Sequence, residues 1–231
     1  RMLPSHIHQQ GGIMVAVRGS HLSNPHDFEI EQWCSSLKLA APVEKSLIDA
    51  WYYAQAKIAE HADQMENAIL TLQSGVEMVE ILHEMNMDSE SLLTAMLFPL
   101  VANKIVDWEQ IQEHFGPKIT KLLKGVEDMD NIRQLNASHS ANASQVDNVR
   151  RMLLAMVDDF RCVIIKLAER ITFLRNAENH FCEEEKVLAA KECSNIYAPL
   201  ANRLGIGQLK WELEDYCFRY LHPEQYRNIA K

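Results

Sequence analysis

The chain contains 231 residues with a formal net charge of −9; 47% of its residues are hydrophobic and 24% are charged. This length allows one large domain or two small ones around a buried core. The acidic balance argues against a general nucleic-acid groove, which needs clustered Lys and Arg to displace counterions. No apolar run reaches the roughly 18–20 residues of a membrane-spanning helix, so we expect a soluble protein without membrane contacts.

Residues 1–13 show no hydrophobic periodicity, and we interpret them as a disordered tag or upstream sequence. Further along, apolar residues recur at spacings of three and four, which predicts amphipathic helices along most of the chain. The predicted helical segments are a short one within 24–39, then 42–62, 66–86, 89–101, 108–116, 117–135, 144–157, 160–175, 182–205, 207–221 and a last short one from 223. Polar stretches at 136–144 and 176–181 are expected to be surface loops.

Polar residues at several helix starts support these boundaries. Asp88 or Ser89 can cap the segment that follows them. The spacing of Asp107 and Gln110 is typical of a capping box. The pair Asp158–Asp159 separates two apolar-striped segments and is best explained as a cap. We find no strand pattern and no fixed-period repeat, so the sequence predicts an all-α bundle of about ten helices.

Scattered cysteines and a run of carboxylates have ordinary structural interpretations. The five cysteines form no CxxC pair, which predicts free, buried thiols in a reducing cytosol. They are Cys34, Cys162, Cys182, Cys193 and Cys217. The carboxylates Glu127, Asp128 and Asp130 are predicted to lie on a solvated helical face.

The sequence contains no GxxxxGK[ST], GxSxG or HExxH motif, so it offers no standard phosphate, nucleophile or zinc site. One carboxylate, Glu169, follows an apolar helical run, where a helical metal hydrolase would present a ligand. Lys166, Arg170 and Arg175 belong to a group of basic residues that could face phosphate. The alternative is that they form ion pairs inside the molecule. For Lys166 and Arg170, the candidate partners are then Asp158, Asp159 or Glu169.

Four stretches of the chain carry a family resemblance: FGPKITKLLKGVEDM, VRRMLLAM, DFRCVIIKLAER and IYAPLANRLGIGQLKWELEDYCFRYL. They resemble the N-terminal region of the long RelA/SpoT family of bacterial stringent-response proteins. The resemblance covers roughly residues 14–231 and is most specific from Val149 onward. It implies an HD-type hydrolase bundle over 14–195 and a helical connector over 196–231. The connector would lead toward a synthetase domain whose catalytic strands these residues do not contain.

The family pattern also implies which residues an active hydrolase would need. Active members remove the 3′-pyrophosphate of (p)ppGpp with Mn²⁺, using two His and two carboxylates within HPxxVAxIL, HDVVEDT and KLADRLHNMR. This chain has SGVEMVEIL, FPLVANK and KLAERITFLR instead. The four metal-ligand positions are therefore Ser74, Phe98, Pro99 and Glu169. The catalytic Glu-Asp pair is replaced by Ala102 and Asn103.

These departures predict a segment with no catalytic residue, no metal and no cofactor, whose stability does not depend on Mn²⁺. The resemblance then implies an inactive regulatory domain of a GTP pyrophosphokinase that makes (p)ppGpp from ATP and GTP or GDP. Its partner would be the synthetase domain of the same chain. The full-length protein would bind the ribosome and uncharged tRNA through other domains, in the cytoplasm.

Two other functions compete with this hypothesis. The first is a non-catalytic module that binds (p)ppGpp, with Lys166, Arg170 and Arg175 as phosphate contacts. The second is a residual metal phosphohydrolase that uses Glu169 together with ligands the family pattern does not match.

Overall fold

The computed structural model describes residues 28–61, 68–137, 150–151, 153–154 and 158–229, and their regular structure is entirely helical. The helices are α1 (Ile30–Ser36), α2 (Ala41–Glu60), α3 (Ala68–Glu84), α4 (Ser89–Ala102), α5 (Trp108–Phe115), α6 (Pro117–Ala137), α8 (Phe160–His180), α9 (Glu183–Glu192), a π-helical turn (Cys193–Tyr197), α10 (Ala198–Arg203), α11 (Gly207–Leu221) and α12 (Pro223–Ile229). The all-α prediction is therefore confirmed. The predicted tag at 1–13 lies outside the described residues, as do most of the predicted helix 144–157 and of the predicted loop 136–144.

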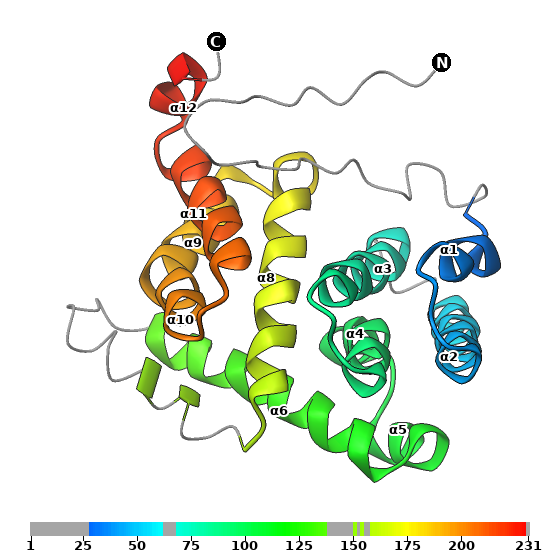
Figure 1. Ribbon diagram of the computed structural model, residues 1–231. Helices are drawn as coiled ribbons and strands as arrows, with labels where there is room; N and C mark the ends of the chain where they lie inside the picture. The colour runs from blue at the N-terminus through cyan, green and yellow to red at the C-terminus, as the bar shows by residue number, and fades with distance from the viewer. Residues whose placement is uncertain (1–27, 62–67, 138–149, 152, 155–157, 230–231) are drawn as a thin grey trace, which may run out of the picture.

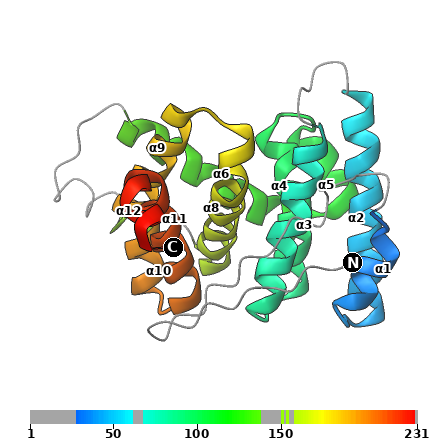
Figure 2. The same cartoon turned by 90° about the horizontal axis from the view of Figure 1, so that it is seen from above.

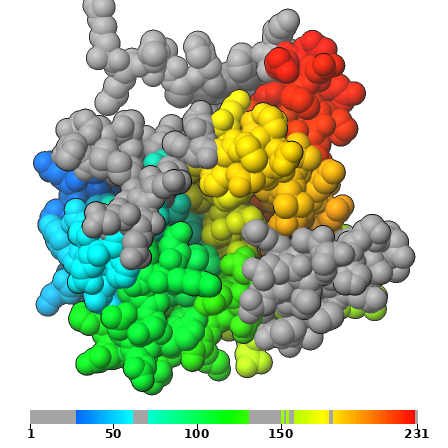
Figure 3. Space-filling model, turned by 180° about the vertical axis from the view of Figure 1, so that it is seen from behind, coloured from blue at the N-terminus to red at the C-terminus, as the bar shows by residue number. Residues whose placement is uncertain are grey.

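Helix α8 is the centre of the bundle. It lies between the α3–α4 pair on one side and the α9–α11 group on the other, while α6 runs across one end of it (Figures 1 and 2). Seen from the opposite face, the N-terminal helices and α12 lie at opposite edges of the molecule (Figure 3). This arrangement buries α8 on more than one side, which explains its many fully buried residues.

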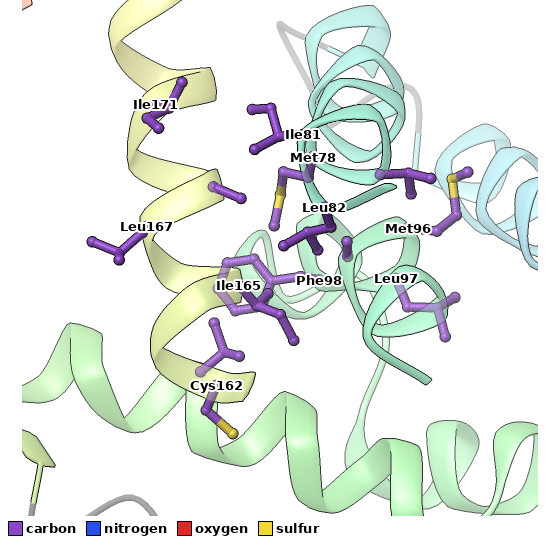
Figure 4. Close-up of a cluster of buried hydrophobic side chains, with 14 of the residues drawn as sticks. Met78, Ile81, Leu82, Met96, Leu97, Phe98, Cys162, Ile165, Leu167 and Ile171 are labelled. Carbon is purple, nitrogen blue, oxygen red and sulfur yellow. The ribbon is translucent and has the colours of Figure 1, made fainter. Parts of the chain in front are cut away.

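The core is formed by apolar side chains at helical spacing. Figure 4 shows Phe98 directed from α4 toward α8, among side chains of α3, α4 and α8. Leu167 points from the other side of α8 and is also fully buried. Because α8 buries both sides, its sequence lacks one clean polar face, and even Lys166 and Arg170 are buried.

Side-chain caps begin three of the helices as the sequence predicted. The Asp88 carboxylate accepts a hydrogen bond from the Ser91 amide at the start of α4. Asp107 and Gln110 form the expected capping box of α5. Asp159 caps α8 by accepting from the Arg161 amide. Each cap satisfies backbone donors that lack a partner within the first turn of a helix.

Two predicted boundaries were wrong. Residues 176–180 continue α8 and are not a loop, because Asn176 donates hydrogen bonds to the Thr172 carbonyl (2.8 Å) and to Glu77 (3.1 Å), and Ala177 is fully buried. The single helix predicted over 182–205 is interrupted by the π-helical turn. Cys182 is exposed at the start of α9, whereas the other four free cysteines are buried as expected.

The C-terminal helices pack on α8 through specific polar contacts. The Tyr220 hydroxyl on α11 donates to the Leu174 carbonyl at 2.6 Å, and Arg175 pairs with Glu212 at 2.6 Å. The division between 14–195 and 196–231 stays a prediction, although residues from both sides of it pack together here. No helix in the described part of the chain is long and apolar enough to span a membrane.

Candidate functional site

The six substituted positions meet at one pocket. It has a volume of about 310 Å³ and lies between α3, α4 and α8. Its lining includes every position that the family pattern assigned to metal binding or catalysis. These are Ser74, Phe98, Pro99, Ala102, Asn103 and Glu169. The fold therefore brings together residues that lie far apart in the sequence, and of their side chains only Glu169 carries a carboxylate.

A glycine sets how closely α3 and α4 approach at this pocket. A Cβ atom on Gly75, the neighbour of Ser74, would stand 3.1 Å from the Met96 carbonyl oxygen of α4. That distance is shorter than ordinary van der Waals contact, so a larger residue would push the two helices apart. Ser74 thus lines the pocket, while the absence of a side chain at Gly75 allows α3 and α4 to pack closely beside it.

On α4, the substituted pair Phe98–Pro99 offers no metal donor. Pro99 lies inside the helix, where it removes a backbone donor. The helix ends soon afterwards at Asn103, whose side-chain amide donates to the Pro99 carbonyl at 2.8 Å. Phe98 is almost fully buried in the core. This part of the wall therefore contributes packing and a helix cap.

The remaining carboxylate, Glu169, is held by two cations of its own helix. Arg170 donates to both of its oxygens, at 2.7 and 2.6 Å, and Lys166 Nζ lies 3.0 Å from Oε2. Burial opposes the charged form of Glu169, but attraction to Arg170 and Lys166 outweighs it and lowers the pKa of the carboxyl well below its ordinary value. Glu169 is therefore an ionised carboxylate whose oxygens already have partners.

The three candidate phosphate contacts all face carboxylates. Lys166 has only 1% of its side chain exposed and pairs with Asp130 on α6 as well as with Glu169. Arg170 packs over the Phe173 ring at 4.7 Å besides binding Glu169. These contacts agree with the alternative interpretation, in which Lys166 and Arg170 form internal ion pairs with Glu169. The other two candidate partners, Asp158 and Asp159 at the start of α8, do not take part in them.

Arg175 also has an internal partner, Glu212 on α11, and it is not part of the pocket lining. Burial opposes its charged form, but the hydrogen bond and charge of Glu212 raise the pKa of Arg175. The use of these cations as phosphate contacts stays a prediction, and a bound phosphate would have to compete with carboxylates already in place.

Sequence reasoning missed several residues of the site. Asp130 was expected on a solvated face but contacts the buried Lys166, because α6 crosses α8 at this point. Phe181 also lines the pocket, with its ring centroid 4.5 Å from that of Phe173. Phe173 lies four residues after Glu169, so the helical period places it on the same face. No local signal identifies Asp130, since its contact with Lys166 joins two helices. Phe181 follows Phe173 by eight residues, so the helical period could have placed it on the same side of α8.

The residues present do not fit a manganese ion. Such an ion needs several nitrogen or oxygen donors that converge on one point. Among the described residues, no group of three or more His, Cys, Asp or Glu side chains is placed to hold a metal. Of the described residues that line the pocket, Glu169 is the one carboxylate, and its oxygens accept hydrogen bonds from Arg170 and Lys166. We therefore derive no metal-dependent chemistry for this pocket.

Comparison with known proteins identifies the class of this fold. The family model "HD domain" matches residues 50–207, more than half of the chain, so the chain belongs to the HD domain family. The match contains all six pocket positions and ends where α11 begins.

Three curated proteins show a more specific similarity than the family model does. The chain is 80% identical over 218 residues to a GTP pyrophosphokinase of Haemophilus influenzae, covering 94% of this chain and 29% of that protein. It is 54% identical over 221 residues to the GTP pyrophosphokinase of Escherichia coli K12, again over 94% of this chain and 29% of that protein. A guanosine-3′,5′-bis(diphosphate) 3′-pyrophosphohydrolase of Aquifex aeolicus is 36% identical over 148 residues, covering 64% of this chain and 20% of that protein. The chain thus spans less than a third of the length of these relatives.

Proposed function

We propose that this chain is an inactive hydrolase-type domain that regulates a longer GTP pyrophosphokinase of the RelA type. The observation that supports the loss of hydrolysis is the pocket itself. The positions that an active hydrolase would fill with imidazoles and carboxylates line one cavity, yet they hold a hydroxymethyl, a phenyl, a pyrrolidine and a single ion-paired carboxylate. A lone carboxylate already neutralised by two cations binds a divalent ion weakly.

The regulatory role is supported by what the chain is similar to and by how its C-terminal helices are attached. Relatives with 54–80% identity are named GTP pyrophosphokinases and continue far beyond the matched region. Helix α11 packs on α8, the helix that carries Glu169. A rigid helical body attached in this way can bias a neighbouring domain between two arrangements. The neighbour in this proposal is the synthetase domain of the same protein, which would make (p)ppGpp from ATP and GTP or GDP.

The regulatory role is tested in the longer protein. Synthesis of (p)ppGpp is compared between the full-length form and a form that lacks residues 14–200, with equal amounts of folded protein. We expect the rate of synthesis to change when the domain is removed. Equal rates in the two forms, under basal and stimulated conditions, would contradict a regulatory role. The same full-length protein is proposed to work in the cytoplasm and to bind the ribosome and uncharged tRNA through its other domains.

The pocket also favours a second candidate function, non-catalytic binding of (p)ppGpp. Its volume of about 310 Å³ lies at the lower end of ligand-binding pockets. The partly buried rings of Phe173 and Phe181 line it and offer aromatic surface on which a base can stack. Calorimetry with ppGpp and pppGpp tests this function, using Phe173→Ala to remove one ring. Heat that saturates with the wild-type chain and is reduced in the variant supports it; no heat at millimolar nucleotide removes it.

A further inference from the structure

Another cavity, of about 640 Å³, lies between α2, α4 and α5 and shares no lining residue with the pocket described above. Aromatic rings from two helices line it: Tyr52 and Tyr53 of α2, and His114 and Phe115 of α5. Asp49 of α2 adds a carboxylate. In Figures 1 and 2, α2 and α5 lie on the side of α8 opposite to α9–α11. This cavity therefore belongs to a part of the bundle separate from the pocket.

The rings at this cavity are held in place by their neighbours. The Tyr53 ring centroid lies 4.6 Å from that of His114 and 5.0 Å from that of Phe115, the latter in an edge-to-face arrangement. The Tyr52 hydroxyl donates to Glu31 Oε1 of α1 at 2.7 Å, while 49% of Tyr52 remains exposed. Aromatic rings are enriched at protein interfaces, and rings fixed in advance lose little freedom when a partner binds.

Carboxylates surround this aromatic surface. Asp49 lines the cavity and is exposed to solvent. Burial and the negative charges of Asp107, Glu60 and Glu113 raise the pKa of the Tyr53 hydroxyl. Three further carboxylates, from α2 and from α5 with its N-cap, therefore act on the ring at the centre of the aromatic group. The cavity thus combines ring faces with negative charge, which is the combination that an organic cation fits.

A lysine of the chain already makes this kind of contact. Lys57 Nζ lies 5.7 Å from the centroid of the Tyr53 ring and 3.6 Å from Glu60 Oε2. The negative face of an aromatic ring attracts a cation at such a distance. This ammonium offsets only one of the four carboxylates around the cavity. The charge that remains favours a further cation from outside the described residues and disfavours nucleic acid and other phosphate ligands.

We propose that the cavity between α2 and α5 is a docking site for an arginine-bearing peptide segment of a partner protein, with a guanidinium that stacks on Tyr52 and pairs with Asp49. A guanidinium is planar and permanently charged, so it matches an aromatic face and a carboxylate at the same time. The volume of the cavity lies within the range of ligand-binding sites. The inference goes beyond the proposed function and does not depend on the loss of hydrolysis.

Peptide binding to the 231-residue chain tests this site. The probe is a fluorescein-labelled peptide of alternating Gly and Arg, followed by fluorescence anisotropy. We expect saturable binding to the wild type. Asp49→Asn and Tyr52→Ala should each raise the Kd about threefold, since each removes one contact to a guanidinium. Tyr52→Phe keeps the ring and should bind as the wild type does. Both positions are exposed, so all three variants should keep the wild-type Tm.

Matched controls separate this site from general attraction to an acidic protein. Glu184→Gln removes an exposed carboxylate of α9, and Trp211→Ala removes a half-exposed ring of α11. Both variants should bind the peptide with the wild-type Kd. A peptide with citrulline in place of each Arg keeps the shape but loses the charge, and we expect it to bind at least about tenfold more weakly.

The inference is overturned when the Arg peptide shows no saturable binding at millimolar concentration, or when the citrulline peptide binds equally well. It is also overturned when Glu184→Gln weakens binding as much as Asp49→Asn, when Trp211→Ala weakens it as much as Tyr52→Ala, or when Tyr52→Phe loses as much as Tyr52→Ala. Each of these results leaves the proposed loss of hydrolysis untouched, because no residue of this cavity lines the pocket of Glu169.

Discussion

Arg161 at the start of α8 forms an ion pair with Asp88, the N-cap of α4, across 73 residues of sequence. The same guanidinium binds Asp159, the N-cap of its own helix, at 2.7 Å. One side chain therefore joins the caps of two helices. These are the helices that carry Phe98 and Glu169, so Arg161 helps to fix one wall of the pocket relative to the other.

Replacing this arginine should loosen the α4–α8 contact. We expect Arg161→Met to lower the free energy of unfolding by about 1–2 kcal/mol, because both caps lose a partner while partial exposure limits the value of each ion pair. Urea denaturation measures this difference. Arg227→Met is the matched control, since Arg227 is exposed on α12 and bonds to the Pro223 carbonyl within its own helix. Equal losses in the two variants would show that Arg161 has no special role.

Removing the charge of Glu169 should destabilise the domain. Glu169→Gln leaves Arg170 and Lys166 without their shared carboxylate, and we expect a loss of about 3 kcal/mol in the free energy of unfolding. Glu183→Gln is the control, because Glu183 pairs with Lys186 while 82% of its side chain is exposed. A loss at Glu169 no larger than that at Glu183 would contradict the paired, buried state of Glu169.

The pH dependence of stability provides a separate test of Glu169. Its folded pKa is lowered from the ordinary value of 4.5. The unfolded chain therefore takes up a proton first, and the stabilisation is complete above pH 4.5 and is lost as the pH falls toward the folded pKa. As the pH falls below about 5, the urea midpoint of Glu169→Gln should decrease less steeply than the urea midpoint of the wild type. Parallel pH profiles would mean that the pKa of Glu169 is the same in the folded and the unfolded chain, which would contradict its pairing with Arg170 and Lys166.

Gly125 on α6 marks a close approach to α8. A Cβ atom at this position would stand 2.5 Å from the Cys162 sulfur. We expect Gly125→Ala to cost about 1–3 kcal/mol through overpacking. The double variant Gly125→Ala with Cys162→Ala should lose less stability than the sum of the two single variants, since the added methyl then takes space vacated by the sulfur. Additive losses in urea denaturation would argue against this contact.

The ion pair between Arg175 and Glu212 should control how firmly α11 is attached to α8. Both side chains are largely buried, so Glu212→Gln leaves Arg175 without its carboxylate. We expect faster hydrogen exchange of α11 amides in this variant, with little change in α3 and α4. Glu214→Gln on the same helix is the control, because Glu214 is half exposed and lies 3.9 Å from Lys210. Unchanged exchange in α11 would show that other contacts are sufficient.

Local rules predicted the helical parts of this fold well. Caps at Asp88, Asp107 and Asp159 were predictable because an acceptor at a helix start needs only the amides of the next few residues. The predicted loop at 176–181 failed because Asn176 is held by Glu77, which lies 99 residues away in the sequence. A polar residue near a helix end is compatible with both a loop and a further turn of helix until its partner from a distant part of the sequence is known.

The site was predictable only in part. The family pattern assigns Ser74, Phe98, Pro99 and Glu169 to one site, and in the structure these four residues line one pocket. The role of Asp130 was not predictable, because its contact with Lys166 depends on how α6 crosses α8. Sequence spacing shows which residues share a helix face, but not which charge on another helix approaches them.

We propose that this pocket does not support metal-dependent hydrolysis of (p)ppGpp. The most direct measurement is the release of pyrophosphate from ppGpp by the 231-residue chain with Mn²⁺, beside the Aquifex aeolicus pyrophosphohydrolase as a positive control. We predict a rate equal to that of the protein-free blank. Release that requires Mn²⁺, stops on addition of chelator and disappears in Glu169→Gln would contradict the claim.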